Sequence, residues 1–436
     1  MANAIRDYVR ELGLGAWAVG GSVRDELLGI EHRDEDFVVP GLDHDGLRRA
    51  LAPYGRVEEM VVHGELKGVR LHSADRALRL LAPAGIELAA APGGEEALAA
   101  DLARRDFTVD AIARNLETGE LADPHGGLAD LAVRRLRAVS DDSLRADPLR
   151  ILRALRLVSQ LGFSPDGATL ALIRRDAPLL ASVAPERIGG GLQEDGHGEL
   201  SLLLLGDAPG RALRLARDTG ALVAVLPEFA NVIGVELDSP RQPLALDEHL
   251  LAVVQGAADL GAGLPVRLAA LVHDLGKPEA DVTRAEHAAH GAEIARAALE
   301  RLRYPGRFVR SVTAVVRAHS FALDGVDARF ARRFLAEHGE LAFDLVELKE
   351  ADLLAKHVPA EEHEALERLR TLLQEALAGP HRLADLEVDG GDLLALGLRE
   401  GPEVGRILEL LLAEVVDDPS RNEREALLER ARAELS

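Results

Sequence analysis

The spacing of apolar residues changes once along this chain, and that change limits the folds it can adopt. Before about residue 101 the apolar residues come in short runs, as at 16–19, 37–39, 61–62, 69–71 and 86–88, bounded by Gly, Pro or charged residues. Runs of this kind are typical of strands. From about Asp101 apolar residues recur every three or four positions, which predicts helices to the end. We expect an α+β fold, with a small mixed-sheet head followed by helices alone.

Length and composition exclude several classes of protein. A chain of 436 residues is too long for one core and predicts about two to four domains. It has no cysteine, so it has no disulfide and any metal must bind to His, Asp or Glu. No apolar run approaches the ~20 residues of a membrane helix, and the N-terminus becomes charged too early for a signal peptide. We therefore expect a cytoplasmic protein without a membrane partner.

The net charge of −23 at first argues against a nucleic-acid partner. Residues 101–190, however, contain 13 acidic and 13 basic side chains, so the negative excess lies outside them. Of the 51 basic residues only four are lysines, Lys67, Lys277, Lys349 and Lys356. Arginine is the better bidentate partner for phosphates and base edges, although genome composition explains most of this bias. A local basic groove remains compatible with the sequence.

Two glycines, Gly20 and Gly21, stand between the first expected strand and a helical segment that contains Ser22 and Arg24. Glycines there let a phosphate approach the backbone, and a helix N-terminus adds N–H donors. Arg24 could then hold a triphosphate. Taken alone, a Gly-Gly pair more often marks only a turn.

Asp34 and Asp36 follow twelve residues later, where a strand begins. Residues i and i+2 of a strand face the same side, so the two carboxylates would project together and attract divalent cations. Such a pair can hold two Mg²⁺ ions for nucleotidyl transfer. Glu87, on the later apolar strand, is a candidate third carboxylate. The alternative for the Asp pair is a solvated acidic turn, and for Glu87 an ordinary surface residue.

The order of these motifs resembles the class II tRNA nucleotidyltransferase and bacterial poly(A) polymerase family. The segment from Asp101 to Asp110 is similar to the family's second signature, and Asp123-Pro-His-Gly-Gly to its third. The resemblance implies that Arg104, Arg105 and Asp106 hold the ribose and triphosphate. It also implies that the segment 147–156 selects the incoming base, through Asp147, Arg150, Arg153 and Arg156.

The base-selecting segment has a physical rationale. Asp147 and Arg150 are three residues apart, so on a helix they would share one face. Side by side, a carboxylate and a guanidinium can match the Watson–Crick edge of cytosine or adenine. The alternative is a surface salt bridge worth a few tenths of a kcal/mol.

Three departures from the family pattern bear on nucleotide choice. The family usually has Asn where Asp110 stands. The stretch from Glu87 to Arg104 is short, and its part 89–94 lacks the usual basic residues. An insertion follows the glycines at 189–191. We expect efficient CC addition and slow or absent addition of the terminal A.

A second constellation lies in the helical half. The order of His249, His273-Asp274, His290, His319 and Asp352 resembles the HD metal-phosphohydrolase superfamily, and His287 could replace His290 as a ligand. Imidazoles and carboxylates without thiolates suit Mn, Ni, Co, Fe or Zn, and the carboxylates also admit Mg²⁺. The alternative is a set of helix-capping or core histidines.

Together these patterns predict an enzyme that adds C and/or A from CTP and ATP to the 3′ end of tRNA without a nucleic-acid template, using Mg²⁺. Poly(A) polymerase activity, or an HD phosphohydrolase with a non-catalytic RNA-binding head, are the alternatives. We expect four domains: the catalytic head (1–135), a helical neck and body (136–243), the HD domain (244–360) and a helical tail (361–436). The sequence predicts no particular oligomeric state.

Overall fold

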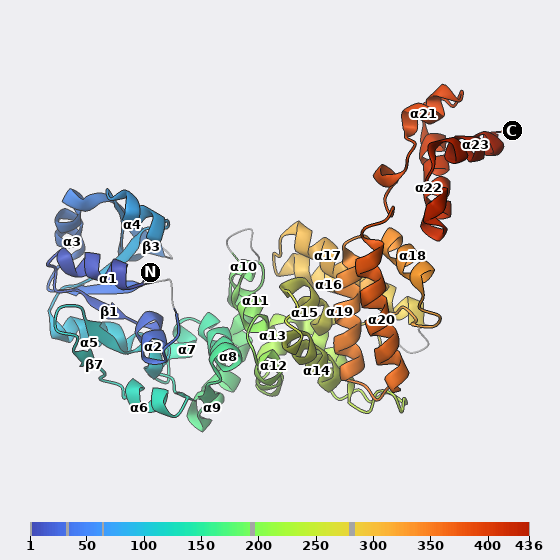
Figure 1. The fold of residues 1–436 in the computed structure, drawn as a ribbon. Coiled ribbons are helices and arrows are strands. Elements are labelled where there is room, and N and C mark those ends of the chain that lie inside the picture. The colour runs from blue at the N-terminus through green and yellow to red at the C-terminus, as the bar shows by residue number, and fades with distance from the viewer. Residues whose placement is uncertain (1, 32–34, 63–64, 192–196, 279–283, 436) are drawn as a thin grey trace. The chain divides into compact units, whose positions relative to one another are not determined.

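The computed structural model describes all residues except 1, 32–34, 63–64, 192–196, 279–283 and 436 (Figure 1). The chain forms two compact units. Unit 1 comprises Met1–Val183 and Thr219–Ala224, and unit 2 comprises Ala184–Asp218 and Val225–Ser436. No helix in the described part of the chain has both the length and the apolar character needed to cross a bilayer. The division into four domains stays a prediction.

Unit 1 is built on a seven-stranded mixed sheet with the strand order β3-β4-β5-β2-β1-β6-β7. Its strands are β1 (Trp17–Val19), β2 (Asp36–Pro40), β3 (Gly55–Val62), β4 (Glu65–Ser73), β5 (Ile86–Ala91), β6 (Ala113–Asn115) and β7 (Leu121–Ala122). Strands β2 and β5 pair in parallel, and the remaining neighbours pair antiparallel. The sheet therefore brings together strands that are 50 residues apart in sequence.

The two faces of the sheet are covered by different helices (Figure 1). Helices α1 (Ala2–Glu11) and α3 (His44–Leu51) pack on one face, in a core that includes Val9, Leu47 and Phe37. Helix α5 (Glu95–Ala103) covers the other face, where Leu98 and Leu102 meet Val38. Alternate residues of β2 enter the two cores, as strand geometry requires.

The remainder of unit 1 is helical in its described residues except for one short parallel pair of strands. Its elements are α2 (Gly21–Leu27), α4 (Arg76–Leu81), α6 (Gly127–Ala132), α7 (Ser143–Ala146), α8 (Leu149–Leu161), α9 (Gly167–Asp176), β8 (Arg135–Leu136) and β9 (Ser164–Pro165). The expectation of helices alone after residue 101 is wrong for β6 and β7, which extend the sheet beyond β1, and for β8 and β9, which pair with each other in parallel. Strands of two or three residues are too short to show an alternating pattern in the sequence.

Unit 2 is helical throughout its described residues. Its helices before the tail are α10 (Pro185–Ile188), α11 (Glu199–Leu204), α12 (Pro209–Asp218), α13 (Ala221–Val225, shared with unit 1), α14 (Leu246–Asp259), α15 (Leu264–Val272), α16 (Arg284–Arg301), α17 (Gly306–Ala318), α18 (Ala328–His338), α19 (Leu341–Leu354) and α20 (Ala360–Ala376). The tail helices α21 (Gly390–Ala395), α22 (Pro402–Asp417) and α23 (Arg424–Leu435) share a separate apolar core around Leu411.

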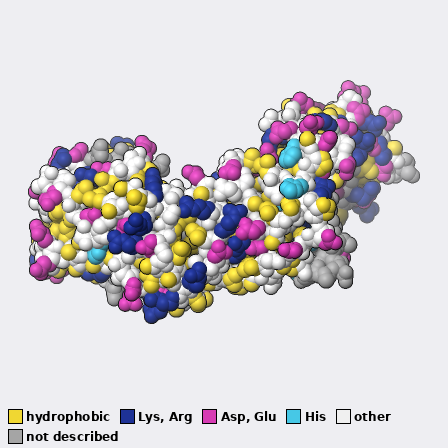
Figure 2. All heavy atoms as spheres, turned by 90° about the horizontal axis from the view of Figure 1, so that it is seen from below, with side chains coloured by type: hydrophobic (Ala, Val, Ile, Leu, Met, Phe, Trp, Pro, Cys, Tyr) yellow, Lys and Arg dark blue, Asp and Glu magenta, His cyan; other side chains and the backbone are white. Residues whose placement is uncertain are grey.

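Charge is mixed over the surface. Figure 2 shows basic and acidic side chains interspersed on the face it presents, although the whole chain carries a net charge of −23. The negative excess is therefore not gathered into one acidic patch on that face.

Candidate active site

Two carboxylates lie next to each other on the face of the sheet that α5 covers. Asp36 opens β2 and aligns with Glu87 of β5 in the parallel pairing, and its neighbour on the other side is Val19 of β1. Aligned residues on adjacent strands point to the same face. Asp36 is exposed and Glu87 is half-buried. Asp34, the predicted partner of Asp36, lies outside the described residues.

Arg70 is a site residue that the sequence analysis missed. It lies on β4 directly across from Glu87, and its guanidinium forms an ion pair with that carboxylate. A cleft of about 150 Å³ opens on this face and includes Asp36, Glu87, Asp101 and Arg105 in its lining. The only hint in the sequence is that Arg70 interrupts an apolar strand.

The backbone conformation of the glycine turn favours glycine, and the side chain of Arg105 lies close to it. Gly20 has a φ of 80°, and the Nη1 atom of Arg105 occupies the place where a Cβ on Gly20 would lie. Arg105 also forms an ion pair with Asp101, with 3.3 Å between Nη2 and Oδ2. The buried hydroxyl of Ser22 donates to the carbonyl of Val19 at 3.3 Å, which closes the turn. Arg105 thus stands beside the Gly20-Gly21 turn, whereas Arg104 is largely exposed.

Arg24 is buried and engaged by two carboxylates. Its Nη1 atom donates to Oδ1 of Asp110 at 2.5 Å, and the guanidinium also pairs with Asp25 at 2.8 Å. Burial favours the neutral form of Asp110 and raises the pKa of its carboxyl, although the charge of Arg24 opposes this shift. Burial alone would lower the pKa of Arg24, but Asp110 and Asp25 hold it above its ordinary value. Asp110, which stands where the family usually has Asn, is therefore paired with Arg24, the residue expected to hold the triphosphate.

One face of α8 carries Arg150, Arg153 and Arg156 at three-residue intervals. The Nε atom of Arg153 lies 2.9 Å from Oδ2 of the buried Asp106. Arg150 donates to the carbonyls of Ser143 at 3.0 Å and of Arg104 at 2.8 Å. These contacts hold Arg150 and Arg153 of α8 against the segment 104–106, which is expected to bind the ribose and triphosphate.

The prediction that Asp147 and Arg150 share a helical face is wrong. Asp147 has extended backbone angles, φ −144° and ψ 100°, and precedes α8, which begins at Leu149. A residue before proline is disfavoured in the helical region, and Pro148 follows Asp147. The Oδ1 atom of Asp147 accepts from the N–H of Leu149 at 3.1 Å, so this side chain lies at the helix start.

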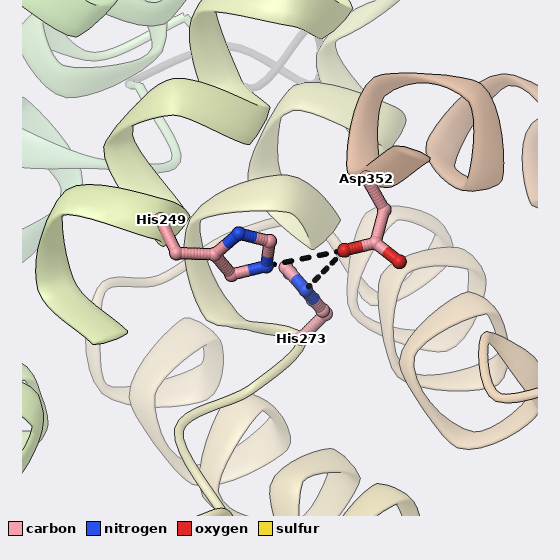
Figure 3. A group of neighbouring side chains, drawn as sticks. All are labelled: His249, His273 and Asp352. Carbon is pink, nitrogen blue, oxygen red and sulfur yellow. Dashed lines mark ion pairs between the residues drawn. The ribbon is translucent and has the colours of Figure 1, made fainter. Parts of the chain in front are cut away.

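A second site lies within unit 2, where three helices meet around a buried cluster. His249 of α14, His273 at the end of α15 and Asp352 of α19 point toward one another (Figure 3). The Nε2 atoms of His249 and His273 lie 3.1 and 3.8 Å from Oδ1 of Asp352. All three side chains are buried. This geometry can hold a metal ion.

Asp274 connects this group to further imidazoles. Its Oδ2 atom lies 3.2 Å from Nε2 of His273, and its Oδ1 atom lies 3.5 Å from Nε2 of His319 at the end of α17. His287 of α16 also approaches Oδ1, with its Nε2 atom at 3.6 Å. Asp274 thus lies beside His287, which is one turn before His290 on α16. The structure therefore favours His287 as the ligand that the sequence analysis named as the substitute.

The buried cluster fits a divalent cation. Nitrogen Nε2 of His249 and His273, both carboxylate oxygens of Asp274 and one of Asp352 are buried without a hydrogen bond of acceptable geometry. Burial lowers the pKa of His273, so its ring is neutral and able to act as a ligand. Burial would raise the pKa of Asp274, but contacts with His273 and Lys277 hold it well below its ordinary value. Buried anions with open lone pairs and neutral imidazoles are a donor set for a transition metal.

Comparisons with known proteins match the regions that contain the two candidate sites. The model of the "Poly A polymerase head domain" matches residues 16–137, that of the "Probable RNA and SrmB- binding site of polymerase A" matches 162–233, and that of the "HD domain" matches 246–365. An A-adding tRNA nucleotidyltransferase of Deinococcus radiodurans is 34% identical over 91% of this chain and 90% of its own length. A CC-adding tRNA nucleotidyltransferase of Thermus thermophilus is 35% identical over 91% and 88%.

The chain belongs to the tRNA nucleotidyltransferase and poly(A) polymerase family. The resemblance inferred from the motifs is confirmed, and the protein is an enzyme of the nucleotidyltransferase class. A solved structure, the Bacillus stearothermophilus CCA-adding enzyme in complex with CTP, aligns with a TM-score of 0.69 and 26% identity over 98% of each chain. The predicted α+β class is that of this tRNA nucleotidyltransferase fold. Nucleotidyltransferase and HD domains generally use divalent metals, in accord with the clusters described above.

Proposed function

We propose that this protein adds C and/or A from CTP and ATP to the 3′ end of tRNA without a nucleic-acid template. The observation that carries the proposal is the alignment of Asp36 with Glu87 on the sheet face where Arg105 stands over the Gly20 turn. Carboxylates and an anion-binding turn are the two parts that nucleotidyl transfer requires. The names of the near full-length relatives, A-adding and CC-adding, support the same substrate.

The proposed roles of the acidic residues combine the positions of Asp36 and Glu87 with the sequence motif that contains Asp34. Asp34 and Asp36 would hold Mg²⁺, with Glu87 as a third carboxylate oriented by Arg70. Bound Mg²⁺ supplies a lowered pKa for the attacking 3′-hydroxyl and charge neutralisation for the departing pyrophosphate.

The glycine turn and the arginines hold the nucleotide. Gly20, Gly21 and Ser22 let the triphosphate approach the backbone, and Arg105 gives it a positive partner. Arg24 and Arg104 contribute further charge. Asp106, fixed by Arg153, would contact the ribose.

Base selection would run through Asp147 and Arg150 at the start of α8. Arg150 donates through Nη1 and Nη2 to two backbone carbonyls, which orient its guanidinium, and a guanidinium has five N–H donors, so others are available to a base. Arg153 and Arg156 extend the same basic face toward the RNA. We expect this reaction in the cytoplasm.

The proposal is tested with three tRNAs that end at the discriminator base, at C or at CC. Each is incubated with CTP, with ATP or with both, and products are resolved at single-nucleotide length. Extension that stops at CC or at the CCA end supports the proposal. Long A tails would indicate a poly(A) polymerase, and no extension of any substrate would leave the head without catalytic function.

We also propose a second activity, metal-dependent hydrolysis of a phosphate ester at the buried cluster of unit 2. The ligands would be His249, His273, Asp274, His319 and Asp352, with His287 in place of the predicted His290. The observation in its favour is the set of buried ligand atoms without hydrogen bonds. Mn, Ni, Co, Fe and Zn suit these donors, and Mg²⁺ is also admitted. Loss of hydrolysis after His273→Ala, with the protein folded, is the expected result.

A further inference from the structure

One imidazole of the buried cluster in unit 2 differs from two of its neighbours in what holds its ring. The Nδ1 atom of His273 donates to the carbonyl of Ala270 at 3.0 Å, and that of His319 donates to the carbonyl of Val316 at 2.6 Å. The Nδ1 atom of His249 is buried and has no hydrogen-bond partner among the described residues. A hydrogen bond at the second ring nitrogen usually orients an imidazole that binds a metal. The orientation of His249 therefore depends on the turn of α14 that carries it (Figure 3).

That turn begins α14 without a side-chain cap. The residue before the helix is Ala245, whose side chain cannot accept a hydrogen bond from the first N–H groups. Two acidic residues, Asp247 and Glu248, stand in the first turn, where the helix dipole favours negative charge. The Oδ1 atom of the buried Asp247 accepts from the N–H of Gly234 at 3.1 Å. The start of α14 is therefore fixed through the side chains of its first turn.

Arg217, on α12, contacts both of these carboxylates. Its Nη1 atom donates to Oδ2 of Asp247 and to Oε1 of Glu248, at 2.6 Å in each case. The side chain of Arg217 is 16% exposed and that of Asp247 is 5% exposed, so solvent screens their attraction only weakly. Burial would lower the pKa of Arg217, but its hydrogen bonds with Glu248, Asp218 and Asp247 hold it above the ordinary value. A charged guanidinium thus joins α12 to the first turn of α14.

The contact with Arg217 is made two residues before His249. The N–H of His249 donates to the carbonyl of Ala245 at 2.9 Å, so this histidine belongs to the same first turn as Asp247. Without Arg217, Asp247 would be a buried carboxylate that has lost its cation, and the turn would have to move to expose it. Such a movement would displace the Nε2 atom of His249, which lies 3.1 Å from Oδ1 of Asp352.

We propose that Arg217 is a positioning residue for His249, and that it acts through the carboxylate of Asp247. The inference rests on metal binding at the buried cluster, as proposed above, and does not depend on hydrolysis. Arg217 would hold the turn in the conformation that the metal requires, so that little rearrangement opposes binding. The residue should therefore affect the affinity of the site and the geometry of the bound ion.

The test titrates Co²⁺ into the full chain and follows the visible absorption of cobalt bound by imidazoles. We expect Arg217→Ala to raise the Kd for Co²⁺ at least tenfold, the usual effect of losing a group that orients a metal ligand. Its absorption bands should shift toward those of His249→Ala, which lacks the ligand. Arg217→Lys keeps the charge and should recover part of the affinity. Arg214→Ala removes an arginine of the same helix that donates to Glu248 at 2.8 Å, and should keep the Kd within twofold of the wild type.

Two further variants separate positioning from a general loss of stability. Arg217→Ala combined with Asp247→Ala should bind Co²⁺ no more weakly than the weaker single variant, because both changes remove one contact. If Arg217→Ala does not fold, Asp247→Asn replaces it: the amide still accepts from Gly234 but loses the charged pair, and should raise the Kd at least threefold. A wild-type Kd and spectrum in the folded Arg217 variant would overturn the positioning role and leave the metal site intact. Absence of imidazole-bound cobalt in the wild type would overturn the metal site itself, and with it the role of His249.

Discussion

At the scale of single residues, the head keeps its charged side chains in pairs that join different elements. Arg24 of α2 forms an ion pair with Asp110, and Arg6 of α1 forms one with Glu35, the residue before the proposed metal-binding carboxylate Asp36. Removing one partner of a buried pair leaves an uncompensated charge, which typically costs about 3–5 kcal/mol. Such pairs therefore determine the position of neighbouring groups as well as stability.

The Arg24–Asp110 pair predicts an effect on nucleotide binding. In Asp110→Asn the acceptor for Arg24 remains but the negative charge is lost, so Arg24 can attract a triphosphate more strongly. We expect the KM for CTP to fall about three- to tenfold, or about 0.7–1.4 kcal/mol, with kcat little changed. Steady-state extension of tRNA measures both constants. A raised KM would show that Asp110 assists nucleotide binding, contrary to this view.

We predict that Arg6, through its ion pair with Glu35, positions the neighbouring carboxylate of Asp36. Its Nε atom donates to Oε1 of Glu35 at 2.8 Å, and the Glu35 side chain is only 1% exposed, so Glu35 is fixed inward while Asp36 faces the cleft. In Arg6→Ala we expect kcat to fall at least tenfold and half-maximal activity to require more Mg²⁺, with an unchanged KM for tRNA. Arg6→Lys should restore part of the loss. Arg10→Ala, which breaks an exposed pair on the same helix, is the matched control and should have no effect. An unaltered Mg²⁺ dependence in Arg6→Ala would contradict the positioning role.

At the scale of elements, the site is assembled by strand pairing. The order of the motifs and the strand character of 37–39 and 86–88 could be predicted from local patterns. The alignment of Asp36 with Glu87 could not, because it depends on the parallel pairing of β2 with β5. The position of Arg70 depends in the same way on β4, and no local pattern distinguishes it from a surface arginine.

The helical half shows the same limit. The candidate ligands of the buried cluster could be predicted from their order along the chain, but His287 and His290 lie one helical turn apart and the sequence did not distinguish them. The packing of α16 beside Asp274 brings the imidazole of His287 to within 3.6 Å of that carboxylate. The sequence did not predict that Lys349 and Lys356 lie near the cluster, because their position depends on the packing of α19 beside it. The error at Asp147 arose from applying helical spacing across Pro148.

The connection between β5 and α5 predicts nucleotide preference. Only residues 92–94 separate the two elements, and they contain no charged side chain. A connection this short offers few polar groups to reshape the pocket from cytosine to adenine. We expect addition of A to a tRNA ending in CC to be at least tenfold slower than addition of C to a tRNA ending at the discriminator base. Comparable single-turnover rates would contradict this prediction.

At the scale of the whole molecule, each site lies within its own compact unit. The residues around Asp36 belong to unit 1, and the cluster around Asp274 belongs to unit 2. The family models match the two regions separately, at 16–137 and 246–365. The two sites share no residue, so their chemistry should be separable.

Independence of the sites predicts the behaviour of the double variant His273→Ala with Asp274→Ala. It should lose the transition metal of the cluster and any phosphatase activity, because both residues would be ligands. Nucleotide addition should stay within twofold of the wild type. Metal content by elemental analysis and tRNA extension are the two measurements. The matched control is His44→Ala with Asp45→Ala, which removes the same residue pair from α3. A parallel loss of addition in the folded double variant would show that the sites are coupled.

The most direct test of the central claim is the single-turnover rate of C addition to tRNA by Asp36→Ala at saturating CTP and Mg²⁺. Loss of a metal-binding carboxylate removes several kcal/mol of transition-state stabilisation, and about 4 kcal/mol corresponds to a rate about a thousandfold lower. We expect a loss of that size in a folded protein. Glu96→Ala, which removes an exposed carboxylate from α5, should retain the wild-type rate. A rate for Asp36→Ala within tenfold of the wild type would contradict the assignment of catalysis to the β2–β5 carboxylates.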